Sequence, residues 1–294
     1  MTTINQKFAV LSMDIEEWYH TGYLKSTDFD RNYSMLDGIS KYLELLDRHH
    51  IKAVFFVLSE LATTAKDAIV RIVRQGHEIA CHGKTHQRPI TMPVSQLRSE
   101  LREAKEVLEQ IAGKEVIGYR ASCFGIDDER YRIIRELGFL YSSSKMDSKY
   151  NPRYGSLDLN GFNQPMQGVY EKDGFYEFAL NTLSILDTNV PISGGGWIRI
   201  LPWHLLMKQM IKSYLLNADM YAFYVHPFEL SDKKMMWLKQ ETLLTNVRTH
   251  IGLGSVEKKT EQLISLLSDQ HFRITTYSDM RKQLSSLNNY SIIS

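Results

Sequence analysis

Two histidines, His82 and His86, stand four residues apart in the segment CHGKTHQ. On a helix or in a tight loop this spacing places two imidazoles about one turn apart, within reach of one metal ion. The spacing alone is equally compatible with two histidines that are solvated or that cap a helix. The strand-like residues HEIAC that run into His82 favour a metal site over a plain helix surface.

Two acids, Asp14 and Glu16, follow the apolar segment FAVLSM at residues 8–13, which is typical of a buried strand. On an extended backbone the side chains of residues i and i+2 point the same way. A pair of carboxylates can divide two roles, one binding a metal and the other removing a proton. A solvated acidic loop is the alternative interpretation.

Arg120 also follows a short apolar run, at the end of the segment GYR. An arginine there could orient a catalytic carboxylate through charge-assisted hydrogen bonds and keep it ionised. The alternative is a surface arginine that pairs with Asp127 or Asp128.

His226 directly follows the apolar segment YAFYV and precedes a proline that ends the strand. A histidine in that position suits a general acid, because its unperturbed pKa lies near neutrality. A core or capping histidine is the alternative.

Three glycines precede Trp197 in the segment SGGGW. The segment lacks both the GK[ST] ending of a phosphate loop and the Rossmann glycine spacing, which excludes nucleotide binding of those kinds. It predicts a loop that allows close approach of the backbone, with Trp197 as a face on which a sugar could stack. A flexible turn beside a buried tryptophan is the alternative.

The two cysteines, Cys81 and Cys123, are too few for a disulfide framework and suit a reducing compartment. We interpret both as packed thiols rather than nucleophiles. The chain shows neither a secretory leader nor an apolar run of about 18 residues, so we expect a cytoplasmic protein without a transmembrane segment. A net charge of +1 without a block of like charge does not favour nucleic acid as a partner.

Short apolar runs alternate with amphipathic segments along all 294 residues, as in a parallel sheet wrapped by helices. This length fits one α/β barrel domain. Residues 142–175 predict an irregular surface excursion. In parallel barrels the site lies at the carboxyl ends of the strands, so the residues above are expected to converge. The predicted strands are 8–13, 53–58, 77–81, 116–119, 176–180 and 221–225, and the predicted helices are 38–49, 67–74, 94–111 and 127–138.

Taken in order, four segments resemble the motifs of the polysaccharide deacetylase family, the NodB-homology group known as carbohydrate esterase family 4. They are SMDIEEWYH, HEIACHGKTH, GYRASCFGI and FYVHPFEL. GHEIACHGKTH is the most specific of them. The DIEEWYH start and the segment GGGWIRILPW at residues 194–203 are most similar to the exopolysaccharide-associated subgroup.

The resemblance implies a distorted (β/α) barrel of about seven strands over residues 1–294, with one catalytic divalent metal. Zinc is the expected ion, with Co²⁺, Ni²⁺ or Mn²⁺ as alternatives. The roles it implies are metal ligation by Glu16, His82 and His86; a base, Asp14, oriented by Arg120; a general acid, His226; and substrate binding by Cys123 through its N–H, by Trp197 and by Arg199.

The chain departs from the family pattern at three positions. Ile15 stands where the family has a metal-binding aspartate, and an apolar side chain cannot bind metal, so we assign that role to Glu16. An exchange of roles between Asp14 and Glu16 stays open. Ser122 replaces a proline beside the expected oxyanion site, and the aspartate of the fourth motif has no clear match, with Asp147 as the candidate.

The activity implied is hydrolysis of an N-acyl group, N-acetyl first, from an amino sugar in the biosynthesis of surface polysaccharide or of a lipid-linked glycan. Peripheral contact with a membrane-bound glycan precursor is part of this expectation. The alternatives are a catalytically inactive carbohydrate-binding barrel and a hydrolase of small cyclic amides. Retention of both histidines, Arg120 and His226 argues against a binding module, which has no need of a general acid.

Overall fold

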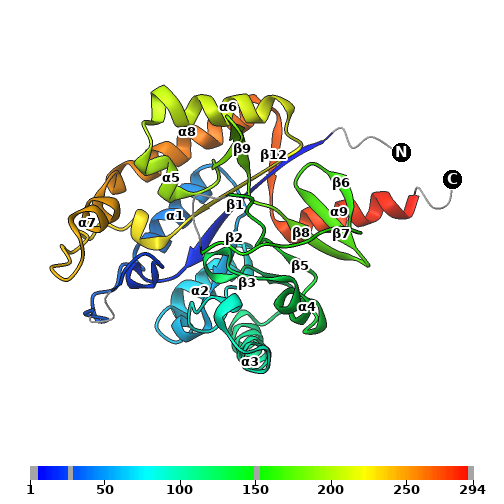
Figure 1. Ribbon diagram of the computed structural model, residues 1–294, viewed down its shortest axis with the longest axis horizontal. Coiled ribbons are helices and arrows are strands. Elements are labelled where there is room, and N and C mark those ends of the chain that lie inside the picture. Colours follow the sequence, from blue (N-terminus) through cyan, green and yellow to red (C-terminus); the bar gives the residue numbers. More distant parts are fainter. Residues whose placement is uncertain (1–5, 26–28, 149–152, 291–294) are drawn as a thin grey trace.

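The computed structural model describes residues 6–25, 29–148 and 153–290. Ten strands of this part of the chain form one curved sheet in the order β11-β1-β2-β3-β4-β5-β8-β7-β6, with β12 paired to β1 (Figure 1). The strands of the sheet are β1 (Lys7–Ile15), β2 (Val54–Val57), β3 (Glu78–Cys81), β4 (Gly118–Tyr119), β5 (Tyr141–Ser142), β6 (Asn163–Met166), β7 (Val169–Lys172), β8 (Phe175–Phe178), β11 (Met220–Val225) and β12 (Phe272–Thr275).

The strands from β11 through β8 pair in parallel, and helices pack around them, which confirms the α/β class and the distorted barrel. The predicted count of about seven strands was slightly low, because β6, β7 and β12 extend the sheet. The helices are α1 (Gly38–Arg48), α2 (Lys66–Arg74), α3 (Val94–Ala112), α4 (Asp128–Glu136), α5 (Gly195–Ile200), α6 (Lys208–Asn217), α7 (Leu243–His250), α8 (Val256–Asp269) and α9 (Tyr277–Tyr290).

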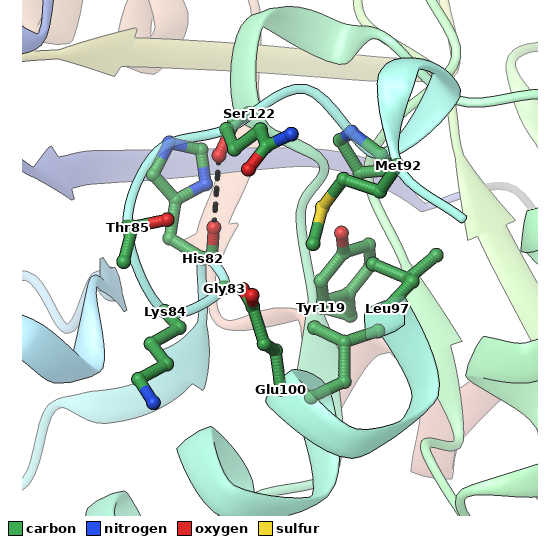
Figure 2. Close-up of a pocket in the computed structure, with 12 residues that line it drawn as sticks. His82, Gly83, Lys84, Thr85, Met92, Leu97, Glu100, Tyr119 and Ser122 are labelled. Carbon is green, nitrogen blue, oxygen red and sulfur yellow. Dashed lines mark hydrogen bonds between the residues drawn. The ribbon is translucent and has the colours of Figure 1, made fainter. Parts of the chain in front are cut away.

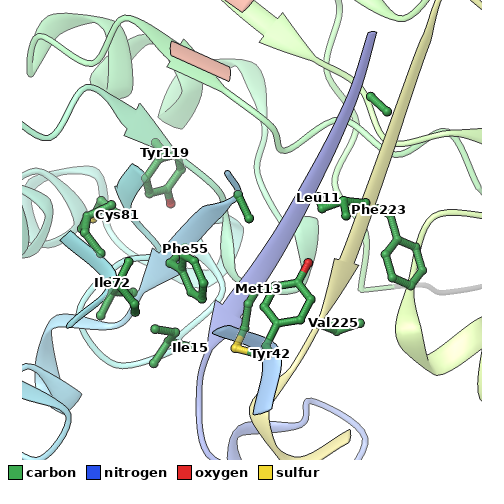
Figure 3. Close-up of a cluster of buried hydrophobic side chains, with 14 of the residues drawn as sticks. Leu11, Met13, Ile15, Tyr42, Phe55, Ile72, Cys81, Tyr119, Phe223 and Val225 are labelled. Carbon is green, nitrogen blue, oxygen red and sulfur yellow. The ribbon is translucent and has the colours of Figure 1, made fainter. Parts of the chain in front are cut away.

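Strand β1 is buried on both faces, as its nearly continuous apolar sequence requires. Its alternate side chains Leu11, Met13 and Ile15 belong to the larger hydrophobic core, whereas Phe8 and Val10 belong to a second core on the other face. Figure 3 shows the first of these sets among the side chains of neighbouring elements. The period of two therefore directs Ile15 into the core.

The segment 142–175 differs from the irregular structure predicted for it. Strands β6 and β7 form an antiparallel hairpin that continues the main sheet beyond β8. Gly168, at φ +79°, supplies the turn between them. Residues 149–152 lie outside the described part of the chain. A second hairpin, β9 (Thr182–Ile185) with β10 (Thr188–Pro191), follows β8 as a separate two-stranded sheet.

Strands β1, β3, β4 and β11 run in the same direction, so their carboxyl ends lie at one edge of the sheet. The residues that follow these four ends are Glu16, His82, Arg120 and His226. The parallel topology thus brings together side chains that are up to 210 positions apart in the chain, from 16 to 226. In the described residues, no helix has the length and apolar character needed to cross a membrane.

Candidate metal centre and active site

Glu16, His82 and His86 form a cluster whose potential ligand atoms all lie within 4.8 Å of one another. Oε2 of Glu16 is 2.5 Å from Nε2 of His86 and 3.9 Å from Nε2 of His82. The Glu16 and His82 side chains are about 3% exposed or less. Two imidazole nitrogens and one carboxylate oxygen are a common donor set for catalytic zinc, which leaves further positions for water and substrate.

The protonation and hydrogen bonding of these residues fit a bound cation. Oε2 of Glu16 is buried and accepts no hydrogen bond of acceptable geometry, although Nε2 of His86 lies close to it. Burial would raise the pKa of Glu16, but His86, His226 and His82 together lower it below its usual value. Burial lowers the pKa of His82 to about 4, which keeps this imidazole neutral. An ionised carboxylate and a neutral imidazole are the forms that bind metal.

A second layer of contacts orients the two histidines. Nδ1 of His82 donates to the main-chain oxygen of Arg120 at 2.9 Å, which leaves Nε2 facing Glu16. His86 lies in a loop rather than on a helix, with a positive φ of 54° that is unusual for a side chain of its size. The ring of His20 stacks on His86 at 5.9 Å, and its Nε2 lies 3.2 Å from Oε1 of Glu60. Burial lowers the pKa of His20 to about 4, so this imidazole is neutral near pH 7. The sequence had suggested no role for His20.

Asp14 is not part of the cluster but pairs with Arg120. Nη1 of Arg120 donates to Oδ1 of Asp14 at 2.6 Å, and both side chains are 4% exposed or less. The guanidinium also donates to Ser12 and to the main chain and hydroxyl of Ser143, at 3.0–3.1 Å. The ring of Phe56 packs against its face at 4.0 Å. Arg120 is therefore a buried partner of Asp14, whereas Asp127 caps α4 and pairs with a different arginine.

His226 approaches the cluster from the far side of Glu16. Its Nε2 lies 3.5 Å from Oε1 of Glu16, and its Nδ1 lies 3.1 Å from Oε2 of Glu229. Burial would lower the pKa of His226, but Glu16 and Glu229 raise it to about 9. Burial likewise opposes ionisation of Glu229, but His226 and Arg199 lower its pKa. Glu229 thus keeps the imidazole oriented and charged.

Glu229 was missed in the sequence, although it stands three residues after His226 in HPFEL. Its carboxylate also accepts from the N–H of His226 at 3.0 Å, which closes a capping box on the short helix Pro227–Glu229. In a capping box a glutamate stands three residues after the N-cap residue, and Glu229 has this spacing from His226. That spacing was the signal available for finding Glu229.

Arg199 lies beside Glu229. Its Nε donates to Oε1 of Glu229 at 3.0 Å, and its Nη1 donates to the main-chain oxygens of Arg248 and Ile251. The side chain is 3% exposed. These contacts indicate a residue that positions Glu229, whereas the sequence had suggested one that binds substrate.

The glycines before Trp197 allow the chain to pass close to Glu229 and Tyr224. A Cβ on Gly195 would lie 2.1 Å from Oε2 of Glu229, and one on Gly194 would lie 2.8 Å from the ring of Tyr224. This is the close backbone approach predicted for the segment, but the predicted loop is wrong, because Gly195, Gly196 and Trp197 form the start of helix α5. Trp197 itself is half-buried and packs against the main core.

The remaining residues predicted for the site are placed as follows. Cys123 lies in a short helical turn (Ser122–Phe124) at φ 52°, and burial raises the pKa of its thiol to about 12. Binding of substrate by the main-chain N–H of Cys123 stays a prediction. Ser122, at the family's proline position, donates its hydroxyl to the main-chain oxygen of His82 at 3.1 Å. Asp147 pairs with Lys145 at 2.8 Å on the surface, so Glu229 is the acid that contacts His226.

A small cavity lies behind the loop that carries the two histidines. Figure 2 shows it lined by Gly83, Met92, Leu97 and Tyr119, with the Ser122–His82 hydrogen bond at its edge. Its volume of about 10 Å³ is the size of one water position. It is too small to hold a sugar.

Comparisons with known proteins agree with this geometry. Residues 26–142 match the family model of polysaccharide deacetylases, and residues 143–283 match that of a domain of unknown function, DUF3473. The first match contains His82, His86 and Arg120, and the second contains Arg199 and His226. The first of these matches supports a relationship to the polysaccharide deacetylase family.

Among curated relatives, a peptidoglycan deacetylase of Helicobacter pylori is 29% identical over 117 residues, 40% of each chain. A peptidoglycan-N-acetylglucosamine deacetylase of Bacillus cereus is 31% identical over 78 residues, 26% of this chain and 28% of the relative. The matched segment spans less than half the length of either relative.

Two solved structures support the fold. A Mycobacterium smegmatis protein crystallised as a candidate polysaccharide deacetylase has a TM-score of 0.61 at 18% identity, covering 98% of this chain and 94% of its own. A family pseudoenzyme from Bacillus anthracis has a TM-score of 0.52 at 12% identity, covering 94% of this chain and 66% of its own. Because active and inactive proteins share this fold, activity has to be argued from the site.

Proposed function

We propose that this chain is a metal-dependent hydrolase that removes an N-acyl group, N-acetyl first, from an amino sugar of a surface polysaccharide or a lipid-linked glycan. The observation that carries the proposal is the arrangement around Glu16. One oxygen of this carboxylate faces His82 and His86, and the other faces Nε2 of His226 at 3.5 Å. A metal cluster and a protonated imidazole therefore lie on opposite sides of one carboxylate, as hydrolysis of an amide requires.

Glu16, His82 and His86 would hold the metal, with zinc as the expected ion. When bound, a divalent ion polarises the amide carbonyl and lowers the pKa of a bound water. Asp14, held in place by the buried Arg120, takes the proton from the attacking water. Burial makes an unpaired carboxylate costly, and the contact with Arg120 gives Asp14 a partner away from solvent.

His226 acts as the general acid. Amide hydrolysis stalls unless the departing nitrogen is protonated, and a charged imidazole can supply that proton. Nδ1 of His226 donates to Glu229, so the proton on Nε2 is directed toward Glu16 and the space beside it. The two relatives named above are described as peptidoglycan deacetylases, which favours an N-acetylated amino sugar as the substrate class.

The direct test is to load the purified protein with zinc and to incubate it with chitin oligosaccharides and with peptidoglycan fragments. We expect release of acetate together with an equal amount of free amine. Removal of the metal with a chelator should stop the release, and zinc should restore it. The protein should also be loaded with each of Zn²⁺, Co²⁺, Ni²⁺ and Mn²⁺. If it binds these glycans but releases no acetate with any of the four ions, the alternative of a catalytically inactive carbohydrate-binding barrel is supported.

Glu229→Gln is expected to shift the pH dependence of the reaction. His226 has to be protonated to act, and Glu229 helps to raise its pKa to about 9, so activity should fall as the pH rises through that region. A bound cation offsets the charge of Glu16, which leaves Glu229 with the larger share of this effect. Without its carboxylate, the alkaline limb of kcat should move to lower pH by about one unit or more.

The matched control is Glu257→Gln, which removes a surface carboxylate that pairs with Arg48. It should leave the pH profile of kcat unchanged. An unshifted alkaline limb in Glu229→Gln would remove the proposed role of His226 as the acid, or of Glu229 as its partner.

A further inference from the structure

Helix α7 presents apolar side chains to solvent and polar side chains to the protein. Leu243, Leu244 and Val247 are 70%, 79% and 45% exposed, whereas Asn246 and Thr249 are 2% exposed or less. At about 100° per residue, the three apolar side chains fall in one stripe on the side of the helix away from the two polar ones. A surface helix of a globular protein ordinarily shows the reverse arrangement.

Hydrogen bonds, not apolar packing, hold the inner side of α7. The amide of Asn246 accepts from the N–H of Leu238 at 2.8 Å and donates to its carbonyl oxygen at 2.9 Å. The hydroxyl of Thr249 donates to the carbonyl of Asn246 at 2.7 Å, and Nε2 of His250 donates to that of Met235 at 3.0 Å. The outward leucines and valine therefore contribute little to the fold of this segment.

The residues around the stripe are basic and aromatic. Trp237, 57% exposed, precedes the helix, and Ile251, 40% exposed, follows it. Four cationic side chains lie at exposed positions in this stretch, whereas Glu241 is the one acid of residues 233–251. We call Trp237, Leu243, Leu244, Val247 and Ile251, together with the exposed cations Lys233, Lys234, Lys239 and Arg248, the α7 surface.

We propose that the α7 surface docks on the surface of an anionic lipid membrane. An exposed stripe of leucine and valine beside tryptophan, bordered by lysine and arginine, is the composition of helices that lie in the interface of a bilayer. A second copy of the chain is a poorer occupant, because a symmetric contact would bring the same cations of both copies together.

The α7 surface lies at the end of the molecule toward which β1 points, the end that carries the candidate site (Figure 1). Arg199 connects the two. It donates to the main-chain oxygens of Arg248 and Ile251, at 2.7 and 2.9 Å, and to Glu229, the partner of His226. Docking through α7 would thus place the site next to the lipid headgroups. The proposal goes beyond the reaction, because membrane binding requires no turnover.

The test is sedimentation of the full-length protein with vesicles of phosphatidylcholine and of phosphatidylcholine mixed with phosphatidylglycerol. We expect binding to the mixed vesicles, weakened by salt, and much less binding to phosphatidylcholine alone. A variant with Leu243→Ser, Leu244→Ser and Val247→Ser should bind about tenfold or more weakly. Its thermal unfolding should match the wild type, because these side chains are outside the core.

The matched control carries Leu205→Ser and Leu216→Ser. Leu205, 86% exposed, lies just before α6, and Leu216, 59% exposed, lies in α6. This variant should bind the mixed vesicles as the wild type does. Failure of the wild type to bind the mixed vesicles, or equal binding by the α7 variant, would overturn the proposal. A third outcome would assign the α7 surface to contact with a second copy of the chain. In that case the wild type would form an oligomer and not bind vesicles, and of the two variants only the α7 variant would dissociate the oligomer.

Discussion

His82→Ala is expected to lower kcat/KM by about 10³-fold or more and to weaken zinc binding at least tenfold. The substitution removes one of three potential ligand atoms that lie within 4.8 Å of one another. Because His82 is neutral near pH 7, with its pKa lowered by burial to about 4, its loss removes a ligand and not a charge. Zinc content per chain, acetate release and thermal unfolding should be measured on the same preparation.

The matched control is His77→Ala, at the other end of β3. His77 is also buried, has a pKa lowered by burial to about 4, and accepts a hydrogen bond from the N–H of Ala53 at 3.1 Å. Its loss should reduce stability but leave zinc content and activity per folded molecule unchanged. Equal zinc binding by His82→Ala and the wild type would show that the cluster is not the metal centre.

The fold could be predicted from the sequence to the extent that apolar segments define buried parallel strands. Strand β1 is an example, because both of its faces are covered and most of its residues are apolar. The hairpin of β6 and β7 escaped prediction, because strand β6 is only four residues long and begins with the polar, exposed Asn163 and Gln164. An edge hairpin of this kind is defined by pairing with β8, which the local sequence does not encode.

The candidate site was predictable where a residue directly follows a strand, since parallel strands end at one edge of the sheet. Neither His20 nor Glu60 follows a strand end of this kind. Their contact beside His86 depends on how two short 3-10 helices, Trp18–His20 and Ser59–Leu61, meet in space, which the spacing of residues in the sequence does not indicate.

Two of the three departures from the family pattern have structural counterparts. Ile15 is fully buried in the main core, and the next residue, Glu16, turns out of the strand toward the histidines. Ser122 replaces a rigid proline with a hydroxyl that holds the main chain of His82. Each of these two departures is thus accompanied by an arrangement that keeps the site assembled.

Arg120→Met is expected to lower the free energy of unfolding by about 3–5 kcal/mol and to reduce activity severely. The variant leaves Asp14 buried without its partner, and it removes the donors to Ser12 and Ser143. An unpaired buried carboxylate tends to take up a proton, which would make Asp14 useless as a base. Chemical denaturation should measure the first effect, and acetate release the second.

Two comparisons isolate the cause. In the control Arg130→Met, the lost partner is Asp127, also 2.6 Å away, but this pair is near the surface at 16% and 32% exposed, so the cost should be about 1 kcal/mol. Combining Arg120→Met with Asp14→Asn should recover part of the lost stability without restoring activity, because the charge left unpaired is gone. If the losses in free energy of unfolding of the two single variants simply add in the double variant, Arg120 supports the fold independently of Asp14. Full activity of Arg120→Met would show that Arg120 does not orient the base.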